Sequence, residues 1–137
     1  MMSQQDPATA AEPLVLVIDD DVCLATEVVE VFQRYGFRTQ RAGTWTEAMM
    51  KLHEDPPDAI LLDLMMPDMD GITTFGHLQD DPATRDIQVI LLTAKSRVGP
   101  QQPWDGLAVA GVLSKPFSPM DLPGQVAALL GWDVPRP

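Results

Sequence analysis

Short, continuous apolar runs recur along the chain, and such runs are typical of strands buried on both faces of a parallel sheet. The clearest are LVLVI, AILL and QVILL. A weaker run, FRTQRA, is mostly polar, and GVLS is short. The pattern predicts five strands, at Leu14–Ile18, 37–42, Ala59–Asp63, Gln88–Thr93 and Gly111–Ser114.

Segments with helical spacing of apolar residues separate these strands. Apolar positions 25, 28, 29 and 32 predict a first helix that ends near Gly36. Thr44 and Glu47 have the spacing of a capping box at the start of a second helix. Further helices are predicted at 72–79 and between 118 and 130. The alternation of strands and helices predicts an α/β fold, with a doubly wound parallel sheet covered on both faces.

The predicted elements form one domain at 13–131, between a flexible N-terminal tail at 1–12 and a C-terminal tail at 132–137. The formal net charge of -11 argues against direct binding to nucleic acid or to an anionic membrane surface. Cys23 is the only cysteine, no apolar run reaches the length of a membrane span, and no signal peptide is evident. We therefore expect a cytoplasmic protein.

Polar side chains follow four of the predicted strands. Asp19 and Asp20 follow the first strand, Asp63 ends the third, Thr93 ends the fourth and Lys115 follows the fifth. The carboxyl ends of parallel strands meet at one edge of the sheet, where ligands bind in such folds. Clustered carboxylates repel one another and favour a hard cation such as Mg²⁺. A carboxylate beside such a cation can act as a nucleophile toward a phosphoryl group.

The motifs VIDDD, LLDLMMPDMDG, LLTA and LSKPF, in this order, strongly resemble the receiver domain of two-component response regulators. The resemblance covers nearly the whole chain. It implies a flavodoxin-like sheet with strand order 2-1-3-4-5. It also implies a signalling phosphoacceptor, which is not an enzyme in the usual sense because it catalyses only its own phosphorylation and dephosphorylation.

The resemblance assigns roles to individual residues. Asp63 would accept a phosphoryl group from a histidine kinase or a histidine phosphotransfer protein. Asp19, Asp20, Asp63 and the backbone carbonyl of Met65 would hold Mg²⁺. Thr93 would move toward the phosphoryl group. Lys115 would contact one of the phosphoryl oxygens.

Other positions depart from the family pattern. Val112 stands where receivers commonly carry an aromatic switch residue. Gly99, Pro100 and Pro103 would disrupt the first half of the fourth helix, so that only 104–110 could be helical. Trp104 would be either an exposed anchor for a partner or a packing residue over this short segment.

Met65 and Lys95 occupy positions that often modulate the lifetime of the phosphoryl group, and we expect slow self-hydrolysis. A haloacid-dehalogenase-like phosphohydrolase is a poorer fit, because that class needs an aspartate where this chain has Met65. A pseudo-receiver, which binds partners without phosphorylation, is the remaining alternative. A stand-alone regulator is modestly favoured over a fragment of a longer protein, and the sequence names neither the kinase nor the downstream target.

Overall fold

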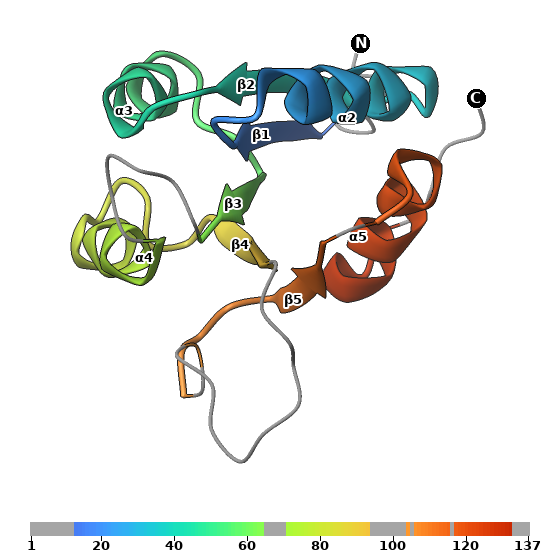
Figure 1. The fold of residues 1–137 in the computed structure, drawn as a ribbon. Coiled ribbons are helices and arrows are strands. Elements are labelled where there is room, and N and C mark those ends of the chain that lie inside the picture. The colour runs from blue at the N-terminus through green and yellow to red at the C-terminus, as the bar shows by residue number, and fades with distance from the viewer. Residues whose placement is uncertain (1–12, 65–70, 94–103, 105, 116, 133–137) are drawn as a thin grey trace, which may run out of the picture.

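A computed structural model describes residues 13–64, 71–93, 104, 106–115 and 117–132. It contains a five-stranded sheet with strand order β2-β1-β3-β4-β5, and every pair of neighbouring strands is parallel (Figure 1). The predicted fold and strand order are therefore confirmed. The strands are β1 (Leu14–Ile18), β2 (Arg38–Ala42), β3 (Ala59–Asp63), β4 (Gln88–Thr93) and β5 (Gly111–Ser114).

Helices lie on both faces of this sheet. They are α2 (Val22–Arg34), α3 (Trp45–Glu54), α4 (Gly71–Asp80) and α5 (Leu122–Leu130), with a 3-10 turn η1 (Pro119–Asp121) before the last. In Figure 1 the sheet is seen nearly edge-on, with α3 and α4 on one side and α2 and α5 on the other. None of the helices in the described ranges is long and apolar enough to cross a membrane.

Alternate residues of each buried strand supply two separate cores. Leu16 and Ile18 of β1 pack with Leu52 of α3 and Phe75 of α4. Their neighbours Val15 and Val17 pack instead with Phe32 of α2 and Val126 of α5. Because successive side chains of a strand point to opposite faces, a continuous apolar run is required wherever helices cover both faces. This requirement explains the runs in β1, β3 and β4.

Side-chain caps fix where two of the helices begin. Asp21 caps α2, and its Oδ1 accepts a hydrogen bond from the backbone N–H of Leu24 at 3.1 Å. Thr44 caps α3 and accepts from the N–H of Glu47 at 3.1 Å. Glu47 Oε1 in turn accepts from the N–H of Gly43 at 2.9 Å, one residue before the position that a capping box predicts. Both helix starts are thus set by the residues that follow β1 and β2.

Of the described residues between β4 and β5, 104 and 106–110, none is helical and only 104 and 106 lie in a turn, so the possible helix over 104–110 is not formed. The N–H of Leu107 donates to Trp104 O at 3.1 Å, and Gly106 has a φ of 82°, which a right-handed helix does not allow. The Trp104 side chain is only 8% exposed and packs in the core that faces α3 and α4. Packing is therefore confirmed for Trp104, and the exposed anchor is wrong.

Candidate functional site

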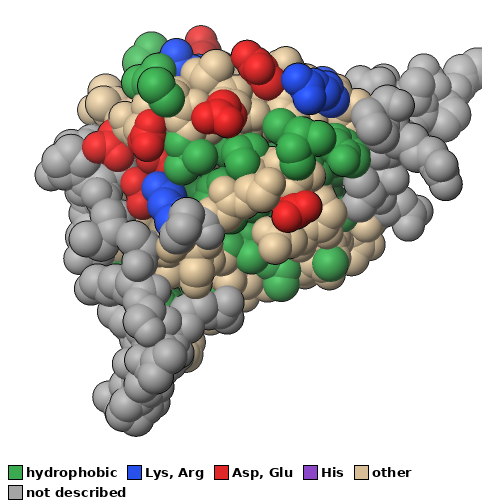
Figure 2. Space-filling model, turned by 45° about the vertical axis from the view of Figure 1, so that its right-hand side comes forward, with side chains coloured by type: hydrophobic (Ala, Val, Ile, Leu, Met, Phe, Trp, Pro, Cys, Tyr) green, Lys and Arg blue, Asp and Glu red, His purple; other side chains and the backbone are tan. Residues whose placement is uncertain are grey.

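The carboxyl ends of four strands bring the predicted site residues to one edge of the sheet. Asp19 follows β1, Asp63 ends β3, Thr93 ends β4, and Lys115 follows β5. Asp63 is in register with Leu92, so Thr93 lies one residue beyond it on the neighbouring strand. Figure 2 shows acidic side chains gathered beside a basic one at one edge of the face that it presents.

Three carboxylates form a cluster at this edge. One oxygen atom from each of Asp19, Asp20 and Asp63 lies within 4.8 Å of the other two. Asp19 is 2% exposed and Asp63 is 4% exposed, whereas Asp20 is open to solvent. Two buried negative charges are costly unless they are hydrogen-bonded or neutralised, so the cluster needs a cation.

Lys115 supplies one positive charge to the cluster. Its Nζ lies 2.8 Å from Asp19 Oδ2 and 3.6 Å from Asp63 Oδ1. Burial lowers the pKa of the Lys115 ammonium group, but its hydrogen bonds and charge interactions with Asp19 and Asp63 outweigh burial and raise this pKa above its ordinary value. Lys115 is therefore a firmly charged group, held between the two buried carboxylates.

Backbone hydrogen bonds hold this geometry in place. Asp19 Oδ1 accepts from the N–H of Asp21 at 2.9 Å, which leaves Oδ2 directed at Lys115. The N–H of Lys115 donates to the carbonyl of Thr93 at 2.7 Å, so the pairing of β4 and β5 continues up to the site. Thr93 itself is fully buried. The carboxyl ends of β3, β4 and β5 therefore position Asp63, Thr93 and Lys115.

The three carboxylates fit a small hard cation. Mg²⁺ holds its oxygen ligands in an octahedron at about 2.0–2.1 Å, so two ligands of one ion lie about 2.9–4.2 Å apart. Oxygen atoms within 4.8 Å of one another need little movement to reach that spacing. One lysine leaves the three-carboxylate cluster with net negative charge. The residues that would hold the ion are Asp19, Asp20 and Asp63.

Other predicted positions lie elsewhere. Met65 and Lys95 fall outside the described residues. Val112 is half-buried in β5 and packs against the core that faces α3 and α4. A β-carbon on Gly71 would lie 2.7 Å from Leu64 Cα and 3.2 Å from the Asp63 carbonyl oxygen, so α4 approaches the end of β3 very closely. This contact was not predicted from the sequence, where a glycine at the start of the helix is the only signal for it.

Comparison with known proteins agrees with this geometry. A model of the family "Response regulator receiver domain" matches residues 15–127. The "Phosphate regulon transcriptional regulatory protein PhoB" of Escherichia coli (strain K12) is 33% identical over 116 residues, which are 85% of this chain and 51% of that protein. The "DNA-binding dual master transcriptional regulator RpaA" of Synechocystis is 32% identical over 86% of this chain and 49% of its own length. The chain thus spans about half the length of these relatives.

Solved structures show the same architecture. The chemotaxis response regulator CheY4 of Vibrio cholerae superimposes with a TM-score of 0.77 at 24% identity, over 86% of this chain and 98% of that one. The N-terminal domain of a response regulator receiver protein from Methanoculleus marisnigri JR1 gives a TM-score of 0.68 at 34% identity, over 88% and 98%. With the site geometry and the family match together, the chain belongs to the response regulator receiver domain family.

Proposed function

We propose that this chain is a phosphoacceptor of a two-component system, in which Asp63 takes a phosphoryl group from a phosphohistidine. The donor would be a histidine kinase or a histidine phosphotransfer protein. One observation carries the proposal: the buried Asp63 carboxylate lies within 3.6 Å of the Lys115 ammonium group and beside the acid pair Asp19 and Asp20. A receiver needs a fixed nucleophile next to a cation site, and the position of Asp63 beside the acidic cluster supports this role.

In the transfer step, an oxygen of the Asp63 carboxylate attacks the phosphorus atom. A P–O bond forms while the P–N bond to the donor imidazole breaks, and the leaving nitrogen keeps the electron pair. Lys115 would donate a hydrogen bond to a phosphoryl oxygen. Asp19 and Asp20, together with Asp63, would hold the metal. Mg²⁺, when bound, supplies positive charge that stabilises the negative charge on the transferred group.

Phosphorylation would then be sensed at the end of β4. The phosphoryl group adds charge and acceptor oxygens at Asp63, and Thr93, one residue beyond the register partner of Asp63 on the neighbouring strand, would donate its hydroxyl to one of these oxygens. Val112 has no aromatic ring that could act as a rotamer switch, so we expect the signal to reach the protein partner by another route. The name of the relative RpaA includes DNA binding. We do not propose DNA binding for this chain, because the chain spans about half the length of these relatives.

Measurement of the intact protein mass tests this proposal. The purified chain is incubated with Mg²⁺ and acetyl phosphate, and its intact mass is measured alongside Asp63→Asn. We expect one phosphoryl adduct in the wild-type protein, and none in the variant or without the metal. Asp86→Asn removes a solvent-exposed carboxylate that is not part of the acidic cluster and should leave the adduct unchanged.

The competing possibility is a pseudo-receiver that binds partners without phosphorylation. An absence of adduct in a correctly folded wild-type protein, together with an absence of transfer from a phosphorylated histidine kinase, would favour it. An adduct that persists in Asp63→Asn would place the acceptor elsewhere. A cytoplasmic location stays a prediction.

A further inference from the structure

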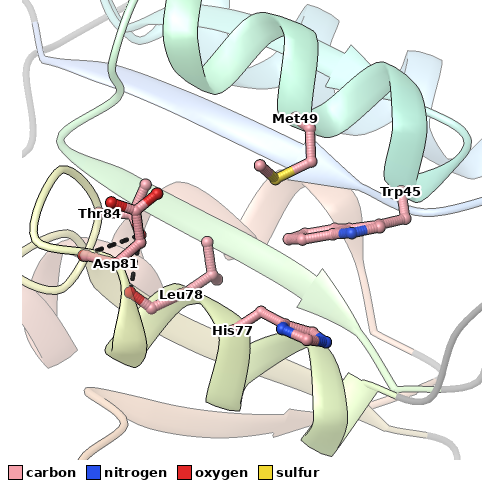
Figure 3. Close-up of a pocket in the computed structure, with 6 residues that line it drawn as sticks. All are labelled: Trp45, Met49, His77, Leu78, Asp81 and Thr84. Atoms are coloured by element: carbon pink, nitrogen blue, oxygen red, sulfur yellow. Dashed lines mark hydrogen bonds between the residues drawn. The ribbon is translucent and has the colours of Figure 1, made fainter.

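A pocket of about 240 Å³ lies between α3 and α4 (Figure 3). None of the residues that line it belongs to the acidic site. Figure 3 shows side chains from α3 pointing across the gap toward α4, with side chains of α4 and of the turn after it on the other side. The lining residues are Trp45, Met49, His77, Leu78, Asp81 and Thr84.

The floor of this pocket is apolar. Leu78 is 2% exposed and Thr84 is 3% exposed. The Thr84 hydroxyl donates to the carbonyl of Leu78 at 2.7 Å, so its hydrogen is already used within the protein. The floor therefore offers a hydrocarbon surface and no free donor to an occupant.

Aromatic rings and a polarizable thioether form another part of the pocket lining. The Trp45 indole stacks on the His77 ring, with centroids 6.4 Å apart and an angle of 29° between the planes. The Met49 thioether lines the pocket from the same helix as Trp45. Trp has the most favourable ring for contact with a cation, and a polarizable thioether adapts to the shape of its occupant.

A single carboxylate completes the lining. Asp81 Oδ1 accepts a hydrogen bond from the N–H of Ala83 at 2.9 Å, which shapes the turn after α4. Asp81 Oδ2 accepts no hydrogen bond from any residue that the structure describes. The pocket thus combines one available anionic oxygen with an indole and an apolar floor, in a chain whose formal net charge is -11.

We propose that this pocket binds an arginine side chain presented by a partner protein. Sites for drug-sized ligands occupy about 300–1,000 Å³, so this volume is too small for a nucleotide and suits one long side chain. The methylene stem would cover Leu78, and the planar guanidinium would lie along Trp45 and donate to Asp81 Oδ2. The proposal does not depend on phosphorylation of Asp63.

Binding is tested in solution with the unphosphorylated full chain labelled with ¹⁵N, by titration with N-acetyl-arginine amide. The indole N–H signal of Trp45 is identified by its loss in Trp45→Phe. We expect this signal to shift and saturate with the arginine probe, and to shift much less with N-acetyl-glutamine amide, N-acetyl-leucine amide or N-acetyl-lysine amide. No saturable shift, or an equal shift with any of the three other probes, would overturn the proposal.

Two aspartates at the end of α4 provide a matched comparison. Asp81→Asn keeps an Oδ1 acceptor for Ala83 but removes the charge at the pocket, and we expect roughly tenfold weaker binding of the arginine probe. Asp80→Asn makes the same change in net charge at an exposed residue outside the lining and should bind as the wild type does. Equal affinity of the two variants would contradict the assignment.

A second variant controls for the possibility that Asp81→Asn alters the local structure of the turn. Met49→Lys places an ammonium group on the opposite wall, where it would compete with the guanidinium for the Asp81 carboxylate and repel it. We expect this variant to lose the saturable shift of the Trp45 signal. Undiminished binding in Met49→Lys would show that the probe binds elsewhere.

Discussion

Lys115 Nζ lies 2.8 Å from Asp19 Oδ2, and this ion pair joins residues 96 positions apart in the sequence. The pair ties the end of β5, an edge strand, to the end of β1. It also means that a protein cation already contacts one of the carboxylates that would hold Mg²⁺.

Removal of this ammonium group should strengthen binding of Mg²⁺. Lys115→Gln frees Asp19 and adds net negative charge to the cluster, so we expect roughly tenfold tighter binding in an isothermal titration. Arg85→Gln removes the same charge from an exposed side chain in the turn between α4 and β4 and should bind as the wild type does. The same Lys115 variant should accept the phosphoryl group more slowly, since it lacks a donor to the phosphoryl oxygens. Unchanged or weaker Mg²⁺ binding would show that the lysine does not oppose the metal.

Gly71 should tolerate no side chain. In Gly71→Ala the new β-carbon meets Leu64 Cα at 2.7 Å, so α4 must shift away from the end of β3, and we expect a loss of about 1–3 kcal/mol in the free energy of unfolding. Gly76→Ala on the same helix meets nothing within 4 Å and should gain about 0.5–1 kcal/mol. Urea unfolding measures both. Equal effects of the two substitutions would mean that helix propensity, and not the contact, decides the outcome.

Glu47 should make stability depend on pH. The hydrogen bond from the Gly43 N–H is the largest cause that lowers the pKa of the Glu47 carboxyl, and Lys51 and Arg41 lower it further, although burial acts in the opposite direction. Because the folded pKa is below the unfolded value of about 4.3, the stabilisation is present above that pH and is lost as the pH falls through the folded pKa.

The measurement compares the wild type with Glu47→Gln, which keeps an oxygen acceptor for Gly43 but carries no charge. The difference in their free energies of unfolding should be largest near neutral pH and should shrink as the pH is lowered below about 4. A difference that stays constant with pH would show that the charge of Glu47 contributes nothing.

Trp104 should be essential for stability despite its place in an irregular segment. Trp104→Ala empties a site that is only 8% exposed, and we expect a loss of about 3–5 kcal/mol, measured by urea unfolding. Leu107→Ala truncates a half-buried residue of the same turn and should cost clearly less. Comparable losses of unfolding free energy in the two variants would show that Trp104 contributes no more to the core than Leu107 does.

The lifetime of the phosphorylated form is a separate prediction. An apolar Met65 and a cationic Lys95 should hinder the water that attacks the aspartyl phosphate. Met65→Asn and Lys95→Glu should therefore lose phosphate faster than the wild type after the donor is removed, as followed by intact mass over time. An unchanged rate of phosphate loss in either variant would contradict this prediction.

Much of the fold could be predicted because burial on both faces leaves a clear trace in the sequence. The bounds of β1, β3, β4 and β5 are as expected from their apolar runs. In β2 the apolar Phe37 suggested an earlier start, but Phe37 lies before the strand and packs in the core with α2 and α5. A solvated edge strand gives a weak apolar signal, and its first residue is correspondingly hard to place.

The candidate site was harder to predict in detail. Strand ends brought the expected residues together, because topology alone delivers them to one edge. Sequence spacing could not show that Lys115 is nearer to Asp19 than to Asp63, since that preference depends on the Asp21 N–H holding the other oxygen of Asp19. The turn at Trp104 was missed for a similar reason, because Gly106 adopts a backbone conformation that composition does not reveal.

The partial exposure of β5 has a dynamic consequence. All of its residues are half-buried, and it pairs with β4 alone in the described sheet, whereas every residue of β1 and β3 is buried. Amide hydrogens of β5 should therefore exchange with solvent through a local opening that leaves the rest of the sheet intact. Such an opening would carry Lys115 away from Asp19, and the charge at the acidic edge would fluctuate on the timescale of strand detachment.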